Sequence, residues 1–155
     1  MTKALSIVGS SRSNGKREKD DFYPTPSYAV EELLKREVFN GNIWECACGD
    51  GAISEVFLKK GFEVRSSDLI DRNYGIVENF FEADYVADNI VTNPPFKYAL
   101  EFVNEAKKKS TSKIAMFLKT VFLESEKRKT MFEDKEFPLK TVYQFSKRVT
   151  LYKDG

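Results

Sequence analysis

Asn42 to Gly61 reads NIWECACGDGAISEVFLKKG, and this stretch is the most informative part of the chain about its fold. Residues 42–47 form an apolar run with the length of a buried strand, and residues 52–60 repeat apolar side chains at helical spacing. Gly49 and Gly51 supply a tight turn between them. The stretch therefore predicts a strand, a glycine turn and a helix in succession.

The same alternation of strand and helix continues on both sides of this unit. Upstream, apolar residues at helical spacing predict a helix that begins at Ser27, ends near Gly41 and has Val38 on its buried face. Downstream, the patterns predict strands at 62–65, 79–81, 88–92, 113–118 and 141–145, and helices at 98–109 and 125–134. Such alternation with short connections predicts an α/β fold, with a mostly parallel sheet covered by helices.

Length and composition indicate one folded domain. A chain of 155 residues with 41% hydrophobic content can bury one core but is too short for two ordinary domains. Residues 1–20 are polar and basic, so we expect a flexible tail there and a single domain over 21–155. The formal net charge of +1 gives no global field toward a polyanion.

Several classes of protein are excluded by what the sequence lacks. With no histidine, neither a Ser-His-Asp nor a Cys-His hydrolase site can form. Cys46 and Cys48 are too few for a four-ligand zinc site, so we expect no metal and interpret both as small buried residues. The chain has neither a long apolar run nor a signal peptide, and we expect a soluble, cytoplasmic monomer with no membrane partner.

Acidic residues and glycines lie where an α/β sheet binds ligands, beyond the carboxyl ends of its strands. Glu45 precedes the glycine turn, and Asp68 ends the next predicted strand, where a carboxylate can accept hydrogen bonds from both ribose hydroxyls. A nicotinamide-type fingerprint would need a further glycine at Ser54, so the pattern departs from a dinucleotide site. Taken singly, a glycine pair after a strand is often only a tight turn.

Asn93-Pro94-Pro95-Phe96 follows an apolar strand, and its two prolines fix an extended loop that cannot continue the sheet. The Asn93 side-chain oxygen and the Pro94 carbonyl are two acceptors that can draw an exocyclic amino nitrogen toward tetrahedral geometry. Phe96 offers a flat face on which a flipped base can stack. The alternative is a strand-terminating turn that carries a core aromatic residue.

The Asn93 segment resembles the Asn/Asp-Pro-Pro-aromatic motif of amino-methyltransferases. With Tyr23-Pro24-Thr25-Pro26 upstream, the chain is similar, over roughly residues 20 to 152, to DNA adenine N6 methyltransferases of the short phage and prophage type. The resemblance implies a Rossmann-like class I methyltransferase sheet and a catalytic loop made of Asn93, Pro94, Pro95 and Phe96. It implies that S-adenosylmethionine is bound by Tyr23, Pro24, Thr25, Glu45, Cys46, Ala47, Gly49, Gly51, Asp68, Asp84 and Asn93.

The family usually continues into another aromatic-rich strand, whereas this chain stops at Gly155, so we expect a sheet without its final strand. The implied activity is methyl transfer from S-adenosylmethionine to the N6 amino group of adenine in DNA. The basic residues at 107–109, 127–129 and 147–148 are candidates for phosphate contacts, although lysines on helix surfaces are often only solvated. An RNA base or a protein glutamine as acceptor, and a non-catalytic nucleic-acid-binding module, remain alternatives.

Overall fold

The computed structural model describes residues 4–10 and 22–151 of the chain. A seven-stranded sheet has the order β4-β3-β2-β5-β6-β1-β7, and every neighbouring pair of described strands is parallel. Its strands are β1 (Ala4–Ser10), β2 (Ile43–Glu45), β3 (Val64–Asp68), β4 (Ile76–Val77), β5 (Ala87–Thr92), β6 (Ser110–Lys119) and β7 (Leu139–Tyr143). The prediction of an α/β fold with a mostly parallel sheet is therefore confirmed.

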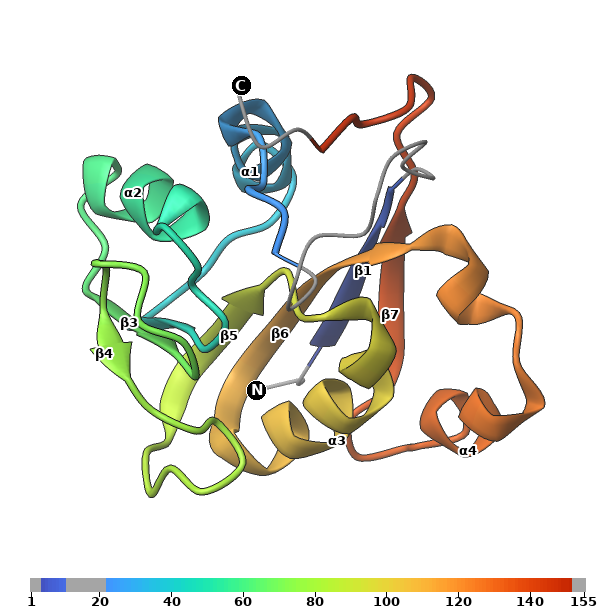
Figure 1. Ribbon diagram of the computed structural model, residues 1–155. Helices are drawn as coiled ribbons and strands as arrows, with labels where there is room; N and C mark the ends of the chain where they lie inside the picture. The colour runs from blue at the N-terminus through green and yellow to red at the C-terminus, as the bar shows by residue number, and fades with distance from the viewer. Residues whose placement is uncertain (1–3, 11–21, 152–155) are drawn as a thin grey trace.

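Helices cover both faces of this sheet (Figure 1). The α-helices are α1 (Ser27–Leu34), α2 (Ala52–Lys59), α3 (Ala99–Lys109) and α4 (Lys129–Phe132), and short 3-10 turns are η2 (Phe96–Tyr98), η3 (Thr120–Leu123) and η4 (Glu126–Arg128). Alternate strand residues point to opposite faces. Ile114 and Met116 of β6 join a cluster with α3 and α4, whereas Ala115 between them joins a cluster with α1 and α2.

The strand order places the predicted ligand-binding residues at the carboxyl ends of central strands of the sheet. From β2 the chain runs outward through β3 to β4, and it then returns to place β5 on the other side of β2. The order of strands thus reverses between β2 and β5, the position at which open α/β sheets bind ligands. The glycine turn follows β2 and Asn93 follows β5, so both lie at this switch point.

The N-terminal segment differs from the expected tail. Residues 4–10 form β1, which pairs with β6 from Ala4↔Lys113 to Ser10↔Lys119 and with β7 on its other edge. The expectation of a flexible tail is therefore wrong for residues 4–10, while 1–3 and 11–20 lie outside the described residues. The segment ALSIVGS is short and apolar at its centre, and ladder pairing on both edges satisfies its backbone groups.

Three other local predictions are corrected. Residues 79–81 form a turn rather than a strand, and the short edge strand β4 precedes them at Ile76–Val77. The predicted helix at 125–134 is broken into η4 and the single turn α4. The helix that begins at Ser27 ends at Leu34, and Val38 lies beyond it with 71% of its surface exposed.

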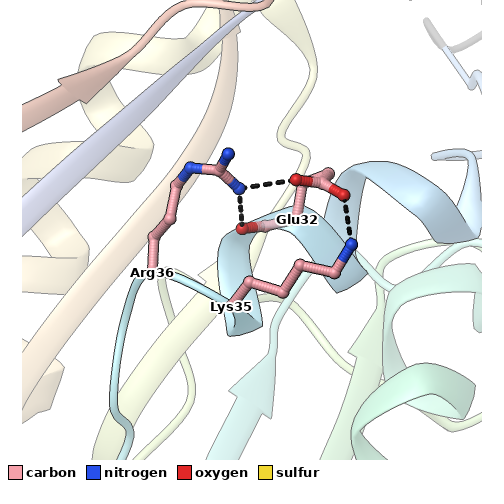
Figure 2. A network of polar contacts seen from close by, with 3 residues as sticks. All are labelled: Glu32, Lys35 and Arg36. Atoms are coloured by element: carbon pink, nitrogen blue, oxygen red, sulfur yellow. Dashed lines mark hydrogen bonds and ion pairs between the residues drawn. The ribbon is translucent and has the colours of Figure 1, made fainter.

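The outer surface of α1 carries a small charged network (Figure 2). Glu32 accepts hydrogen bonds from Lys35 Nζ and Arg36 Nη1, each at 2.6 Å. These groups lie on the solvent side of the helix, where water and salt screen ion pairs. Within the described residues, no helix is long and apolar enough to cross a membrane.

Candidate functional site

A pocket of about 600 Å³ lies at the carboxyl ends of β2, β3 and β5. This volume lies within the range of small-molecule sites. Nine residues expected from the sequence line it: Tyr23, Pro24, Thr25, Glu45, Cys46, Ala47, Asp68, Asn93 and Pro95. The sheet topology therefore brings the predicted cofactor segment and the predicted catalytic loop to one cavity.

Gly49 and Gly51 shape the pocket without lining it. Both have positive φ, at 55° and 88°, a conformation that glycine adopts without steric cost. Each is also covered by an aromatic ring, because an added Cβ would lie 2.1 Å from a Phe22 ring atom at Gly49 and 2.3 Å from a Tyr74 ring atom at Gly51. These glycines make room for rings of the protein itself, and Phe22 then forms part of the pocket wall.

The Asp68 carboxylate is fixed by backbone N–H groups of two loops. Oδ2 accepts from Gly49 N at 2.8 Å, and Oδ1 accepts from Ile70 N at 3.0 Å. Each carboxylate oxygen can accept more than one hydrogen bond, so acceptor capacity remains on the pocket side. The loop after β2 and the loop after β3 thus hold one oriented acceptor at the cavity.

Glu45 is a buried group that joins β2 to the start of α2, with only 2% of its surface exposed. Its Oε2 accepts from Ser54 N at 2.7 Å and is also bonded to the Ser54 hydroxyl. Burial raises the Glu45 pKa to about 8, although both bonds from Ser54 act to lower it. Glu45 is therefore mainly a neutral carboxylic acid at pH 7, and Ser54, where a dinucleotide fingerprint would have glycine, is its partner.

The two cysteines are not reactive nucleophiles. Both side chains are buried. Burial raises the pKa of Cys46 well above its ordinary value and that of Cys48 to about 12, so both are protonated thiols at neutral pH. In the described part of the chain, no group of His, Cys, Asp or Glu could hold a metal ion.

Asn93 presents its amide to the pocket in one defined orientation. Its Nδ2 donates to the Tyr23 carbonyl at 3.3 Å and to Thr25 Oγ1 at 3.1 Å. Asn93 Oδ1 has no hydrogen-bond partner in residues 22–151 and belongs to a side chain that lines the cavity. A free acceptor therefore remains where the loop after β5 meets the pocket.

The residues that follow Asn93 in the predicted catalytic loop lie differently with respect to the cavity. Pro95 lines the cavity, but Pro94 and Phe96 do not. The face of the Phe96 ring is instead covered by Lys119, whose Nζ lies 4.5 Å from the ring centroid. Tyr98, which was not singled out from the sequence, lines the cavity with 47% of its surface exposed.

Asp84 is not brought to the pocket. It is exposed beyond the cavity, whereas Asn79, Phe80 and Phe81 line the corresponding wall. Asn79 Oδ1 accepts from Phe81 N at 3.0 Å, which is an Asx turn, and such a turn explains why 79–81 is not a strand. The sequence signal for this turn is an asparagine two residues after the apolar pair Ile76–Val77. The strand prediction for 79–81 did not take this signal into account.

The lysines at 107–109 are engaged within the fold. Lys107 pairs with Asp134 at 2.7 Å, Lys108 with Glu105 at 2.9 Å, and Lys109 donates to the Phe80 carbonyl at 2.5 Å. The ammonium groups that were candidates for phosphate contacts therefore already have partners within the protein. Near the cavity, the cationic side chains that line it are Arg72, stacked 4.1 Å from the Phe22 centroid, and the exposed Lys97.

No protein-family model, curated protein or solved structure matches the chain. Its function must therefore be argued from the site itself.

Proposed function

We propose that the chain is an S-adenosylmethionine-dependent methyltransferase of the Rossmann-like class I type that acts on the exocyclic N6 amino group of adenine in DNA. The observation that carries the proposal is the Asn93 amide at the switch point, in a residue that lines the cavity, with its nitrogen bonded to Tyr23 and Thr25 and its oxygen without a hydrogen-bond partner in residues 22–151. A free acceptor beside two prolines is what an amino-nitrogen substrate needs.

The cavity has groups that suit the proposed cofactor. Asp68 offers an oriented carboxylate for ribose hydroxyls, and the apolar wall of Leu69, Ile70 and Phe80 suits the faces of a purine. A volume of about 600 Å³ leaves room for a nucleoside and a further planar group. When bound, S-adenosylmethionine supplies an electrophilic methyl group on a sulfonium.

The residues of the loop after β5 would do the work of positioning. Asn93 Oδ1 would accept one N–H of the substrate amine, which draws its lone pair away from the ring, and the Pro94 carbonyl, outside the cavity lining of the free protein, would take the second N–H only if the loop opens toward the substrate. With S-adenosylmethionine bound, transfer would form the nitrogen–carbon bond as the carbon–sulfur bond breaks, and the methylated amine would then lose one proton to water. No charged base is required.

Binding of the cofactor is tested first, and the acceptor of the methyl group is tested second. Calorimetry with S-adenosylmethionine should show binding, and the absence of measurable heat at any useful concentration would overturn the proposal. The protein with isotopically labelled cofactor is then incubated separately with DNA, RNA and protein pools. Label in N6-methyladenine of DNA is expected, whereas label in RNA or in protein glutamine would replace DNA as acceptor. Binding without transfer to any pool would favour a non-catalytic module.

A further inference from the structure

Thr25 lies beneath the amide that the proposed reaction depends on. It belongs to the segment before α1, and its side chain is buried, with 6% of the residue exposed. Its hydroxyl oxygen lies 3.1 Å from Asn93 Nδ2, although the two residues are 68 positions apart in the chain. A buried polar residue of the pocket lining therefore contacts the candidate catalytic loop directly.

The chemistry of the two partners determines which way the Asn93 amide points. The Tyr23 carbonyl, 3.3 Å from Asn93, can only accept a hydrogen bond, so the group that faces it must be the NH2. Thr25 Oγ1 accepts the other N–H. With both amide hydrogens taken up on this side, Oδ1 is directed away from Tyr23 and Thr25. The terminal torsion of asparagine is broad and roughly two-fold, so without these partners the flipped amide is easily reached.

The backbone around Thr25 is suited to holding a fixed acceptor. Pro24 precedes it, and Pro26, with φ −59°, caps the start of α1. A residue before proline is restricted to extended conformations, and proline itself fixes φ. The Thr25 hydroxyl is thus presented by a stiff segment rather than by a mobile loop.

We infer that Thr25 is a positioning residue, which together with the Tyr23 carbonyl locks the Asn93 amide so that its oxygen accepts the N–H of the amine substrate. This inference rests on the proposed function and assigns a role to Thr25 other than binding the cofactor. If the Asn93 amide were flipped, its NH2 would face the N–H of the amine substrate. The acceptor needed in the transition state would then be lost. Misplacing a reacting group by about 1 Å can cost about a hundredfold in rate.

The inference is tested by three variants of the full chain. Thr25→Val keeps the shape but removes the hydroxyl, Thr25→Ser keeps the hydroxyl, and Ser27→Ala removes an exposed hydroxyl at the first residue of α1. We expect Thr25→Val to lower kcat by about tenfold or more. Its affinity for S-adenosylmethionine should be nearly unchanged, Thr25→Ser should restore most of the rate, and Ser27→Ala should match the parent.

Two results in this assay would overturn the inference. If Thr25→Val transfers methyl groups at the parental rate, the hydroxyl does not position Asn93. If Thr25→Val loses cofactor binding in proportion to its loss of rate, Thr25 is a cofactor ligand instead. Failure of the proposed function itself is seen separately, because the parent protein would then bind no cofactor or transfer no methyl group.

A second measurement tests the inference without any turnover. In nitrogen-15 spectra, the side-chain NH2 of Asn93 is identified by its loss in Asn93→Asp. Thr25→Val should shift these two resonances and speed their exchange with water, and Thr25→Ser should not. Unchanged resonances in Thr25→Val would overturn the positioning role even if the parent proved inactive.

Discussion

The carboxyl groups at the ends of β2 and β3 accept hydrogen bonds from backbone N–H groups of the fold, whereas the amide oxygen at the end of β5 has no partner among the described residues. Glu45 and Asp68 accept hydrogen bonds from Ser54, Gly49 and Ile70. Asn93 uses only its nitrogen. Both oxygens of Asp68 and one of Glu45 thus already accept from the protein, whereas the Asn93 oxygen accepts from none of the described residues.

This difference matches two kinds of task. A group that binds a cofactor gains from being rigid, because less entropy is lost on binding. A group that acts on a transition state must interact more strongly there than in the ground state, so it cannot already be saturated by the protein. Substitutions that alter one group at a time therefore test whether the two kinds of group have separate tasks.

The largest expected effect comes from removing the Asn93 oxygen acceptor. Asn93→Ala should lower the rate of methyl transfer by about a hundredfold to a thousandfold, as loss of one preorganised hydrogen-bonding group typically does. Affinity for S-adenosylmethionine, measured by calorimetry, should be nearly unchanged. Asn104→Ala is the matched control, since Asn104 is an exposed asparagine on α3. Equal loss of binding and of transfer in Asn93→Ala would contradict the separation of tasks between the two kinds of group.

The next effect tests the buried carboxyl of Glu45 through stability. Its pKa is raised from 4.5 to about 8, so the folded chain keeps a proton that the unfolded chain releases. Stability should therefore fall as pH rises from about 4.5 to about 8, by up to about 1.4 kcal/mol per pH unit, and then level off. In Glu45→Gln, urea unfolding should show this slope largely removed.

The exposed Glu31 supplies the control for that experiment. Glu31→Gln should retain the parental slope, because its side chain is outside the core. Glu37, Glu105 and Asp134 have lowered pKa values, so their contributions change below the window used here. A parental slope in Glu45→Gln would show that another group takes up the proton.

A smaller effect on the free energy of unfolding shows whether Gly49 is needed for its positive φ alone or also for the space that the Phe22 ring occupies. Gly49 and Gly61 both have positive φ, but only Gly49 has a ring against it, with Phe22 Cε2 2.1 Å from an added Cβ and nothing within 4 Å at Gly61. Gly61→Ala should cost about 1 kcal/mol of unfolding free energy. Gly49→Ala should cost about 1 to 3 kcal/mol more through overpacking. Denaturant unfolding measures both, and equal losses would remove the role assigned to Phe22.

Much of this architecture was predictable because its signals are local. The strand before Glu45, the glycine turn and the helix after it have periodic patterns within 20 residues, and the positions of Asp68 and Asn93 at strand ends follow from strand boundaries. Once the sheet is parallel, those strand ends meet at one edge. Six residues that line the cavity therefore follow from predicted strand ends: Glu45, Cys46, Ala47, Asp68, Asn93 and Pro95.

What escaped prediction depends on contacts between distant segments. The bond between Thr25 and Asn93 spans 68 positions, and the rings of Phe22 and Tyr74 reach glycines that no periodicity connects to them. The pairing of β1 with β6 joins residue 4 to residue 113. Composition alone assigned that segment to a tail, because strand formation there depends on partners supplied by the folded sheet.

The smallest expected effect concerns which aromatic residue stacks on the substrate base. The Phe96 face is covered by Lys119 Nζ at 4.5 Å, and its ring does not line the cavity, whereas Tyr98 lines it and is half exposed. Tyr98→Leu should weaken binding of DNA that contains 2-aminopurine at the target by about 1 to 3 kcal/mol and reduce the quenching of its fluorescence. Phe96→Leu, the matched change in the same loop, should alter both much less. The opposite ranking would mean that Lys119 leaves the Phe96 ring when DNA binds, and the open side of the pocket would then extend beyond the cavity seen in the free protein.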